Sequence, residues 1–185
     1  ITIAFTFRSF SQPILLFCLM PVSLIGVAWG HWIHGFPVNI LSLLGVIALI
    51  GIMVNDGLVL IGKFNNNLKQ NFNFNEGLID AGKSRFRAIF LTTATTVAGL
   101  TPLLLEKSRQ AQWLKPMAIS VSYGIAFATI LTLILLPIFI SLNNDLKVIF
   151  KWLVSGNYPD KEVVERAIIE KKEEQKMDQM NNPEN

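Results

Sequence analysis

Long stretches without a charged residue constrain this chain more than any other feature. No Asp, Glu, Lys or Arg occurs between Ser9 and Asn55, within 88–105 or within 116–144. Uncharged, mostly apolar runs of about 18 residues or more are typical of helices that cross a membrane. The chain is therefore predicted to be an all-α membrane protein.

We expect four membrane spans, at about 12–32, 38–62, 88–105 and 116–142. At 1.5 Å per residue the second span is about 37 Å long, enough to cross a hydrocarbon core of about 30 Å with some tilt. Gly35 and Pro37 predict a tight turn after the first span, and Trp29 and Trp32 fit an aromatic belt at the membrane interface. Residues 12–142 are thus expected to form a four-helix bundle.

The two ends of the chain are expected to differ from the bundle. Residues 1–11 read as the end of a preceding span and a cytoplasmic link, so we expect a piece of a larger membrane protein. Residues 143–185 are expected to be a cytoplasmic tail with an interfacial helix at 146–154, a short charged helix at 160–172 and disorder from residue 173. A further amphipathic surface helix is expected at 76–81, between the second and third spans.

The basic residues predict the orientation. The link between the second and third spans is rich in Lys and Arg, as is the tail, whereas the link between the first and second spans has neither. The link between the third and fourth spans carries three basic residues, so the difference in basic residues between the two sides of the membrane is incomplete. By the positive-inside rule the residue 63–87 link and the C-terminus are cytoplasmic.

The composition also excludes some classes of function. The net charge of +3 comes from loops and tail, and no basic patch is interleaved with aromatic residues, so nucleic acid is not an expected partner. The single Cys18 excludes an internal disulfide and a multi-cysteine metal site. His31 and His34 are three residues apart, but no third ligand is near, so we expect interfacial histidines and no metal site.

One acidic residue, Asp56, interrupts the apolar run Gly51–Ile61. A carboxylate at the centre of a membrane helix costs roughly 2.5–3.5 kcal/mol, so such a group usually faces a protein interior or a water path and is a functional candidate. The alternative is that Asp56 pairs permanently with a polar group elsewhere in the protein and only fixes the register of its helix.

Helical spacing predicts which polar and small residues share a face. On the second span these are Ser42, Gly45, Leu49, Ile52 and Asp56; on the third, Arg85, Thr92, Thr96 and Gly99; on the fourth, Ser120, Gly124, Ala128 and Thr132. Small residues at such intervals allow close helix packing. The threonine hydroxyls have two alternatives: bonding back to the carbonyl of residue i−4, or lining a hydrated path to Asp56.

Four segments in order resemble the resistance-nodulation-division (RND) efflux pumps of the AcrB/AcrD/AcrF type. The resemblance covers roughly 1–142, and its segments are 51–61, 81–93, 100–104 and 116–122 continuing to Pro137. It implies twelve spans per protomer, of which this chain holds the last four, and a homotrimer with large periplasmic domains. It further implies a periplasmic adaptor, an outer-membrane channel, and the inner membrane of a Gram-negative bacterium.

The resemblance also implies a mechanism, with one departure. Such pumps are secondary transporters that exchange protons for exported amphiphiles, without a cofactor. Arg85 and Thr92 match relay positions of the family, and Thr96 follows on the same face. Multidrug members of the family carry a lysine followed by an asparagine at the positions of Asn55 and Asp56, and that lysine takes part in a Lys–Asp ion pair. Because this chain has no lysine there, that ion pair cannot be assigned to it, and Asp56 has no identical counterpart in those members.

We therefore expect part of a proton-driven exporter in which Asp56, Asn55, Arg85, Thr92 and Thr96 form a proton relay. A heavy-metal cation exporter of the same family and a non-transporting anchor or sensing bundle are the alternatives.

Overall fold

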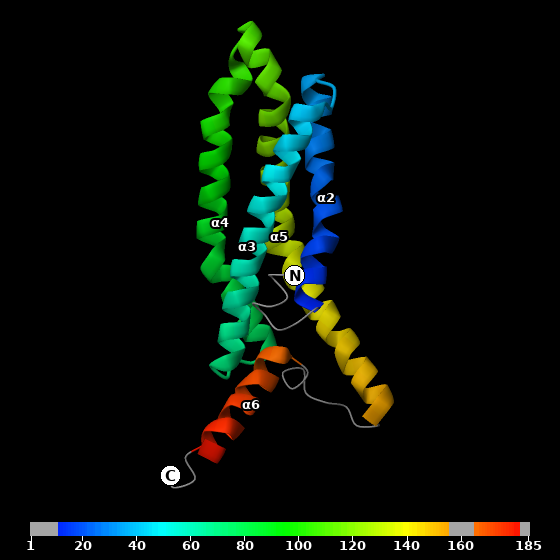
Figure 1. Cartoon of the computed structure of the whole chain (residues 1–185), viewed down its shortest axis with the longest axis vertical. Helices are drawn as coiled ribbons and strands as arrows, with labels where there is room; N and C mark the ends of the chain where they lie inside the picture. The colour runs from blue at the N-terminus through cyan, green and yellow to red at the C-terminus, as the bar shows by residue number, and fades with distance from the viewer. Residues whose placement is uncertain (1–10, 156–164, 182–185) are drawn as a thin grey trace.

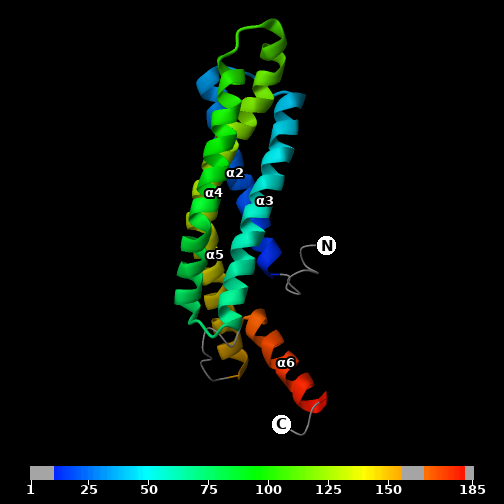
Figure 2. The same ribbon diagram turned by 90° about the vertical axis from the view of Figure 1, so that its left-hand side faces the viewer.

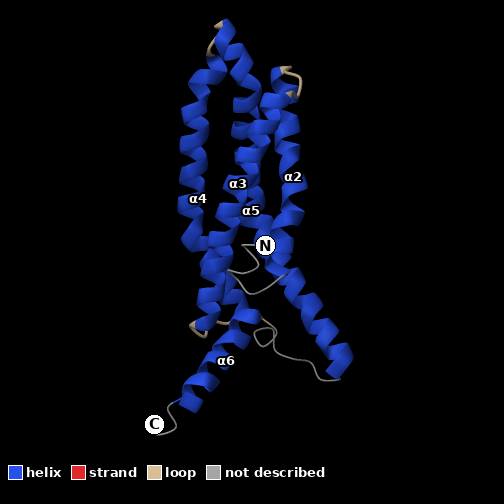
Figure 3. Cartoon of the chain, viewed as in Figure 1, coloured by secondary structure: helices blue, strands red, loops and turns tan. Residues whose placement is uncertain are grey.

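The computed structural model describes residues 11–155 and 165–181, and these residues form five helices and no strand (Figure 3). The helices are α2 (Ser11–His34), α3 (Ile40–Lys69), α4 (Phe74–Leu105), α5 (Arg109–Ser155) and α6 (Arg166–Asn181). The first four are long and apolar enough to cross a membrane. The prediction of an all-α membrane fold with four spans is confirmed.

Helix α5 is the central element of the bundle, and α2, α3 and α4 all pack along it (Figures 1 and 2). The α2–α3 and α4–α5 turns lie at one end of the bundle, called here the upper end (Figure 1). The α3–α4 turn lies at the opposite, lower end, where α6 also begins. This up-and-down order follows from the short turns, which can join only antiparallel neighbours.

Local sequence signals explain the upper turn. Gly35 has a φ of +66°, the left-handed conformation that glycine adopts without a steric penalty. The Asn39 side chain then accepts a hydrogen bond from the Ser42 backbone N–H at 3.0 Å, and the Ser42 hydroxyl oxygen accepts one from the Asn39 backbone N–H at 3.2 Å. This capping box satisfies two donors that would otherwise be unpaired where α3 begins.

Two helices are longer than their apolar runs predict. The surface helix expected at 76–81 is not separate but forms the first turns of α4, and the one expected at 146–154 is the end of α5. Gly82 alone is insufficient to end a helix, and α5 also passes through Pro116 and Pro137. Membrane helices tolerate proline where neighbouring groups satisfy the freed carbonyls.

The tail also differs from expectation. Helix α6 continues to Asn181, although disorder was expected from residue 173. The expected end of a preceding span falls on residues 1–10, and this segment, like 156–164 and 182–185, lies outside the described residues.

The core lies along α5 and continues to the lower end of the bundle. There the rings of Phe64 and Phe74 pack edge to face, with their centroids 5.3 Å apart. Many large apolar side chains elsewhere are exposed, among them Ile47 at 65% and Leu91 at 59%. Exposed apolar faces on long helices are expected where a helix meets lipid or further membrane helices.

Candidate functional site

Asp56 lies at the edge of the buried face of α3. The buried positions of this helix include Ser42, Gly45, Leu49, Met53 and Gly57, at intervals of 3, 4, 4 and 4. Asp56 is next to the last of these and is partly exposed, and Asn55 is exposed. The carboxylate therefore stands beside the α5 contact rather than within it.

The structure does not bring Asp56 and Arg85 together. Within 11–155 and 165–181, no hydrogen bond or ion pair involves the Asp56 carboxylate. Arg85 lies on α4, partly buried, and its Nε has no hydrogen-bond partner in the described part of the chain. Within the described helices, the Asp56 carboxylate on α3 and the Nε of Arg85 on α4 therefore both lack a hydrogen-bond or ion-pair partner.

The threonines of α4 divide into two kinds. The hydroxyls of Thr92 and Thr96 donate to the carbonyls of Ala88 and Thr92 four residues earlier, at 3.0 and 2.8 Å. Thr95 and Thr101 bond back in the same way. Thr93 differs, because it is buried and its hydroxyl meets that of Thr129 on α5. No hydrogen bond joins Thr92 or Thr96 to Asp56, and Thr92 is exposed while Thr96 is partly exposed.

Small residues set how closely α5 approaches its neighbours. A Cβ added at Gly45 would lie 2.7 Å from the Met117 carbonyl oxygen and 2.8 Å from the Ser120 Cβ. A Cβ added at Gly124 would overlap the Leu49 side chain, and Ala128 is 3% exposed. Gly99 is different, since it is exposed and no atom lies within 4 Å of its Cβ position. The helix contact expected at Gly99 is not made within the described helices.

Both histidines fasten the upper end of α2. The His31 side chain is buried, with Nδ1 3.0 Å from the Phe36 carbonyl oxygen and Nε2 3.0 Å from the Ser120 hydroxyl on α5. His34 Nε2 lies 3.0 Å from the Tyr123 hydroxyl. Across the described ranges, no group of three or more His, Cys, Asp or Glu side chains is placed to hold a metal ion.

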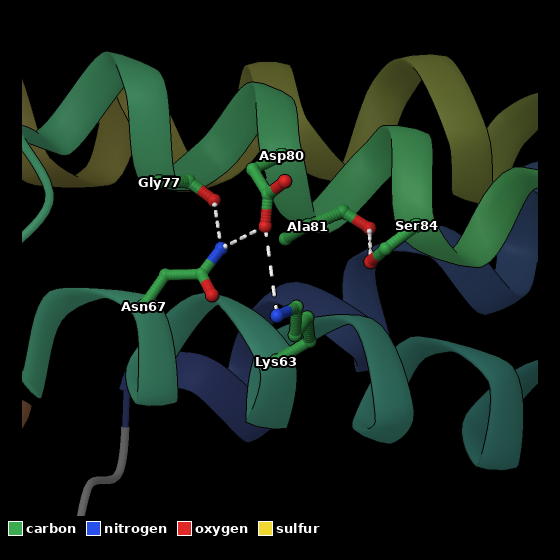
Figure 4. Close-up of polar contacts among 6 residues, drawn as sticks. All are labelled: Lys63, Asn67, Gly77, Asp80, Ala81 and Ser84. Atoms are coloured by element: carbon green, nitrogen blue, oxygen red, sulfur yellow. Dashed lines mark hydrogen bonds and ion pairs between the residues drawn. The ribbon is translucent and has the colours of Figure 1, made fainter. Parts of the chain in front are cut away.

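A polar cluster at the lower end joins α3 to α4 (Figure 4). The fully buried Asn67 donates from Nδ2 to the Gly77 carbonyl oxygen at 2.9 Å and to Asp80 Oδ2 at 2.8 Å. Lys63 Nζ lies 3.6 Å from the same Asp80 oxygen. Sequence reasoning missed this cluster, although three successive asparagines after an apolar span were a signal that a helix end needed polar partners.

The comparison with known families decides what kind of bundle this is. The sequence profile of the AcrB/AcrD/AcrF family matches residues 1–143, most of the chain. The chain belongs to the AcrB/AcrD/AcrF family of RND transporters. The family resemblance of the four sequence segments is confirmed.

The relatives of this AcrB/AcrD/AcrF family chain include proteins named for swarming motility and for metal resistance. It is 29% identical to the swarming motility protein SwrC of Bacillus subtilis over 75% of the chain, and 28% identical to the cobalt-zinc-cadmium resistance protein CzcA of Cupriavidus metallidurans over 71%. It is 31% identical over 64% to the nickel-cobalt-cadmium resistance protein NccA of Alcaligenes xylosoxydans xylosoxydans. The matches span only 13%, 12% and 11% of these relatives' own lengths.

Proposed function

We propose that this chain forms four spans from the C-terminal half of a proton-driven RND exporter and that Asp56 takes part in its proton relay. The observation that carries the proposal is an ionisable side chain inside a membrane span without a partner in the described helices. Such groups are costly in lipid and usually lie on ion or proton pathways. Family membership supports a transporter over a passive anchor.

The relay requires that Asp56 gain and lose a proton while water or polar groups reach it. Partial exposure of Asp56 beside the exposed Asn55 provides an open side from which a further helix of the protein can approach. Arg85, always charged, would stabilise the ionised carboxylate through water, and Thr92 and Thr96 would orient that water. A proton crossing the full potential releases about 2.3 kcal/mol per 100 mV, which is the energy available for export.

The wider assembly belongs to the same proposal. We expect a homotrimer in the plasma membrane, with the lower end and the C-terminus in the cytoplasm, as the Lys and Arg of the 63–87 link indicate. In a Gram-negative cell the partners would be a periplasmic adaptor and an outer-membrane channel. Relatives named for cobalt, zinc, cadmium and nickel resistance favour heavy-metal export as the second candidate for the cargo.

The test uses the whole transporter in proteoliposomes with an imposed proton gradient. We expect Asp56→Asn to abolish proton flux, because an amide cannot carry a proton between states, and Asp56→Glu to retain part of it. Glu76→Gln removes an exposed acid from the first turn of α4 and should leave flux unchanged. Full proton-coupled export by Asp56→Asn would exclude the relay role.

The same preparation discriminates between cargos. Stimulation of proton flux by an amphiphilic dye or detergent, but not by Co²⁺, Zn²⁺ or Cd²⁺, supports amphiphile export. The reverse pattern supports the metal exporter. A protein that is folded but shows no proton flux with either kind of cargo would favour the non-transporting anchor or sensing bundle.

A further inference from the structure

Helix α6 lies against the lower end of the bundle although it is outside the part that the family shares. The family match ends at residue 143, whereas α6 covers Arg166–Asn181. Figures 1 and 2 both show its first turns beside the lower ends of the bundle helices. Two polar anchors, at Glu165 and Lys171, hold it there.

The first anchor fixes the start of α6 to α5. Glu165 is 2% exposed, and its Oε1 accepts a hydrogen bond from Asn144 Nδ2 at 2.8 Å. Lys147 Nζ lies 3.3 Å from the same oxygen. Asn144 and Lys147 are three residues apart and so share one face of α5. A buried carboxylate needs such partners, since an unpaired buried charge is strongly unfavourable.

The second anchor fixes α6 to the end of α3. Lys171 Nζ donates to the Lys69 carbonyl oxygen at 2.7 Å and to Asn71 Oδ1 at 2.8 Å. The backbone N–H groups of the following turn already bond to the carbonyls of Asn66, Asn67 and Leu68. Lys69 is the last residue of α3, so the Lys171 ammonium group adds a partner for the next carbonyl, at the end of the helix where the dipole is negative. The Lys69 and Glu170 side chains add an ion pair at 3.6 Å.

We propose that α6 is a releasable latch that ties the lower end of α3 to α5 and restrains their relative movement. Release is favoured by the composition of the contact. Among the described side chains of α6, only Ala167 is buried and Ile168 packs on the core from its edge, whereas Lys172, Glu173, Gln175 and Met177 are exposed. Ionic contacts near the surface weaken as salt screens them.

Docking is tested by cross-linking in the whole transporter, with Cys18→Ala and no other cysteine. Lys69→Cys and Glu170→Cys replace an ion pair whose side chains are 37% and 16% exposed, and leave the Lys69 carbonyl, which Lys171 contacts, in place. A short bifunctional thiol reagent should join the two cysteines. Adding Lys171→Met should reduce the yield several-fold, as should molar salt, whereas Lys172→Met, an exposed neighbour, should not.

Hydrogen exchange provides a second measurement without cysteines. Amides of residues 66–77 should exchange several-fold faster in Lys171→Met, in Glu165→Gln and in a chain ending at residue 164, and at the wild-type rate in Lys172→Met. Absence of the cross-link in the parent protein, or equal exchange in every variant, would overturn the latch.

The restraint itself rests on the proposed function, because it concerns a transport cycle. Helix α3 carries Asp56 and packs along α5, so a cycle that shifts one against the other must stretch or open the latch. We expect Lys171→Met to export several-fold faster than the wild type, with Lys172→Met unchanged. If Lys171→Met loses the cross-link but exports no faster than the wild type, the proposal that α6 restrains the movement of α3 against α5 is wrong. A wild type that exports nothing would refute the proposed function, while cross-linking and exchange would still decide whether α6 docks.

Discussion

Replacing Gly45 by alanine tests whether the close contact between α3 and α5 depends on the absence of a side chain at this position. The added Cβ would lie 2.7 Å from the Met117 carbonyl oxygen and 2.8 Å from the Ser120 Cβ. Neither atom is the free end of a flexible side chain, so α3 and α5 must move apart. Overpacking of this kind costs typically 1–3 kcal/mol. We expect a loss of about 2 kcal/mol, or about 30-fold in the unfolding equilibrium.

A second effect contributes to the stability loss expected for Gly45→Ala. Ser120 is also the partner of His31, whose Nε2 is 3.0 Å from its hydroxyl oxygen. Pushing the α5 backbone away at Ser120 stretches this buried hydrogen bond, which contributes about 0.5–1.5 kcal/mol when intact.

The matched control is Gly51→Ala in the same helix. Gly51 is exposed and nothing lies within 4 Å of its Cβ position. The same substitution there should be neutral or stabilise the helix by up to about 1 kcal/mol, because glycine loses more backbone entropy than alanine. Reversible unfolding of the 185-residue chain in mixed micelles, followed by circular dichroism and tryptophan fluorescence, gives both free energies. Equal values for the two variants would refute the packing argument.

Three further variants probe the polar contacts. His31→Ala should lower the free energy of unfolding by about 1–3 kcal/mol, and a double-mutant cycle with Ser120→Ala should show coupling between them, whereas additive losses would contradict the bond. Thr93→Val should cost about 0.6–1.7 kcal/mol by the same assay, since its hydroxyl bridges two helices, while Thr92→Val should be nearly neutral because its bond is local. Asn67→Ala should cost about 1–3 kcal/mol and speed amide exchange in the α3–α4 turn; unchanged exchange would show that the cluster does not hold the turn.

The sequence was sufficient for the spans but only partly for the faces. Uncharged runs locate the spans because lipid penalises every charge in the same way. Helical spacing places Ser42, Gly45 and Leu49 on one face of α3, and all three are buried, but the buried stripe then continues at Met53 and Gly57 and not at Ile52 and Asp56. Successive steps of four follow the path of α5 across α3, and that path depends on packing that no single helix encodes. Asp56 is left at the edge for this reason.

Contacts between distant segments were the least predictable. Nothing near Thr93 distinguishes it from Thr92, yet one meets Thr129 on α5 and the other bonds to its own helix. Nothing near Glu165 predicts a buried carboxylate, because Asn144 and Lys147 lie in another helix. Such pairs are fixed by the arrangement of whole helices. Local spacing identifies candidates for them but not the partner.

The length of α5 has a mechanical consequence. Its 47 residues give about 70 Å at 1.5 Å per residue, more than twice a hydrocarbon core of about 30 Å. For a straight rod of that length, a tilt of about 5° around its middle displaces each end by about 3 Å. That displacement is comparable to the length of one hydrogen bond. A slight reorientation inside the bilayer is therefore enough, at the far end of the helix, to make or break a polar contact.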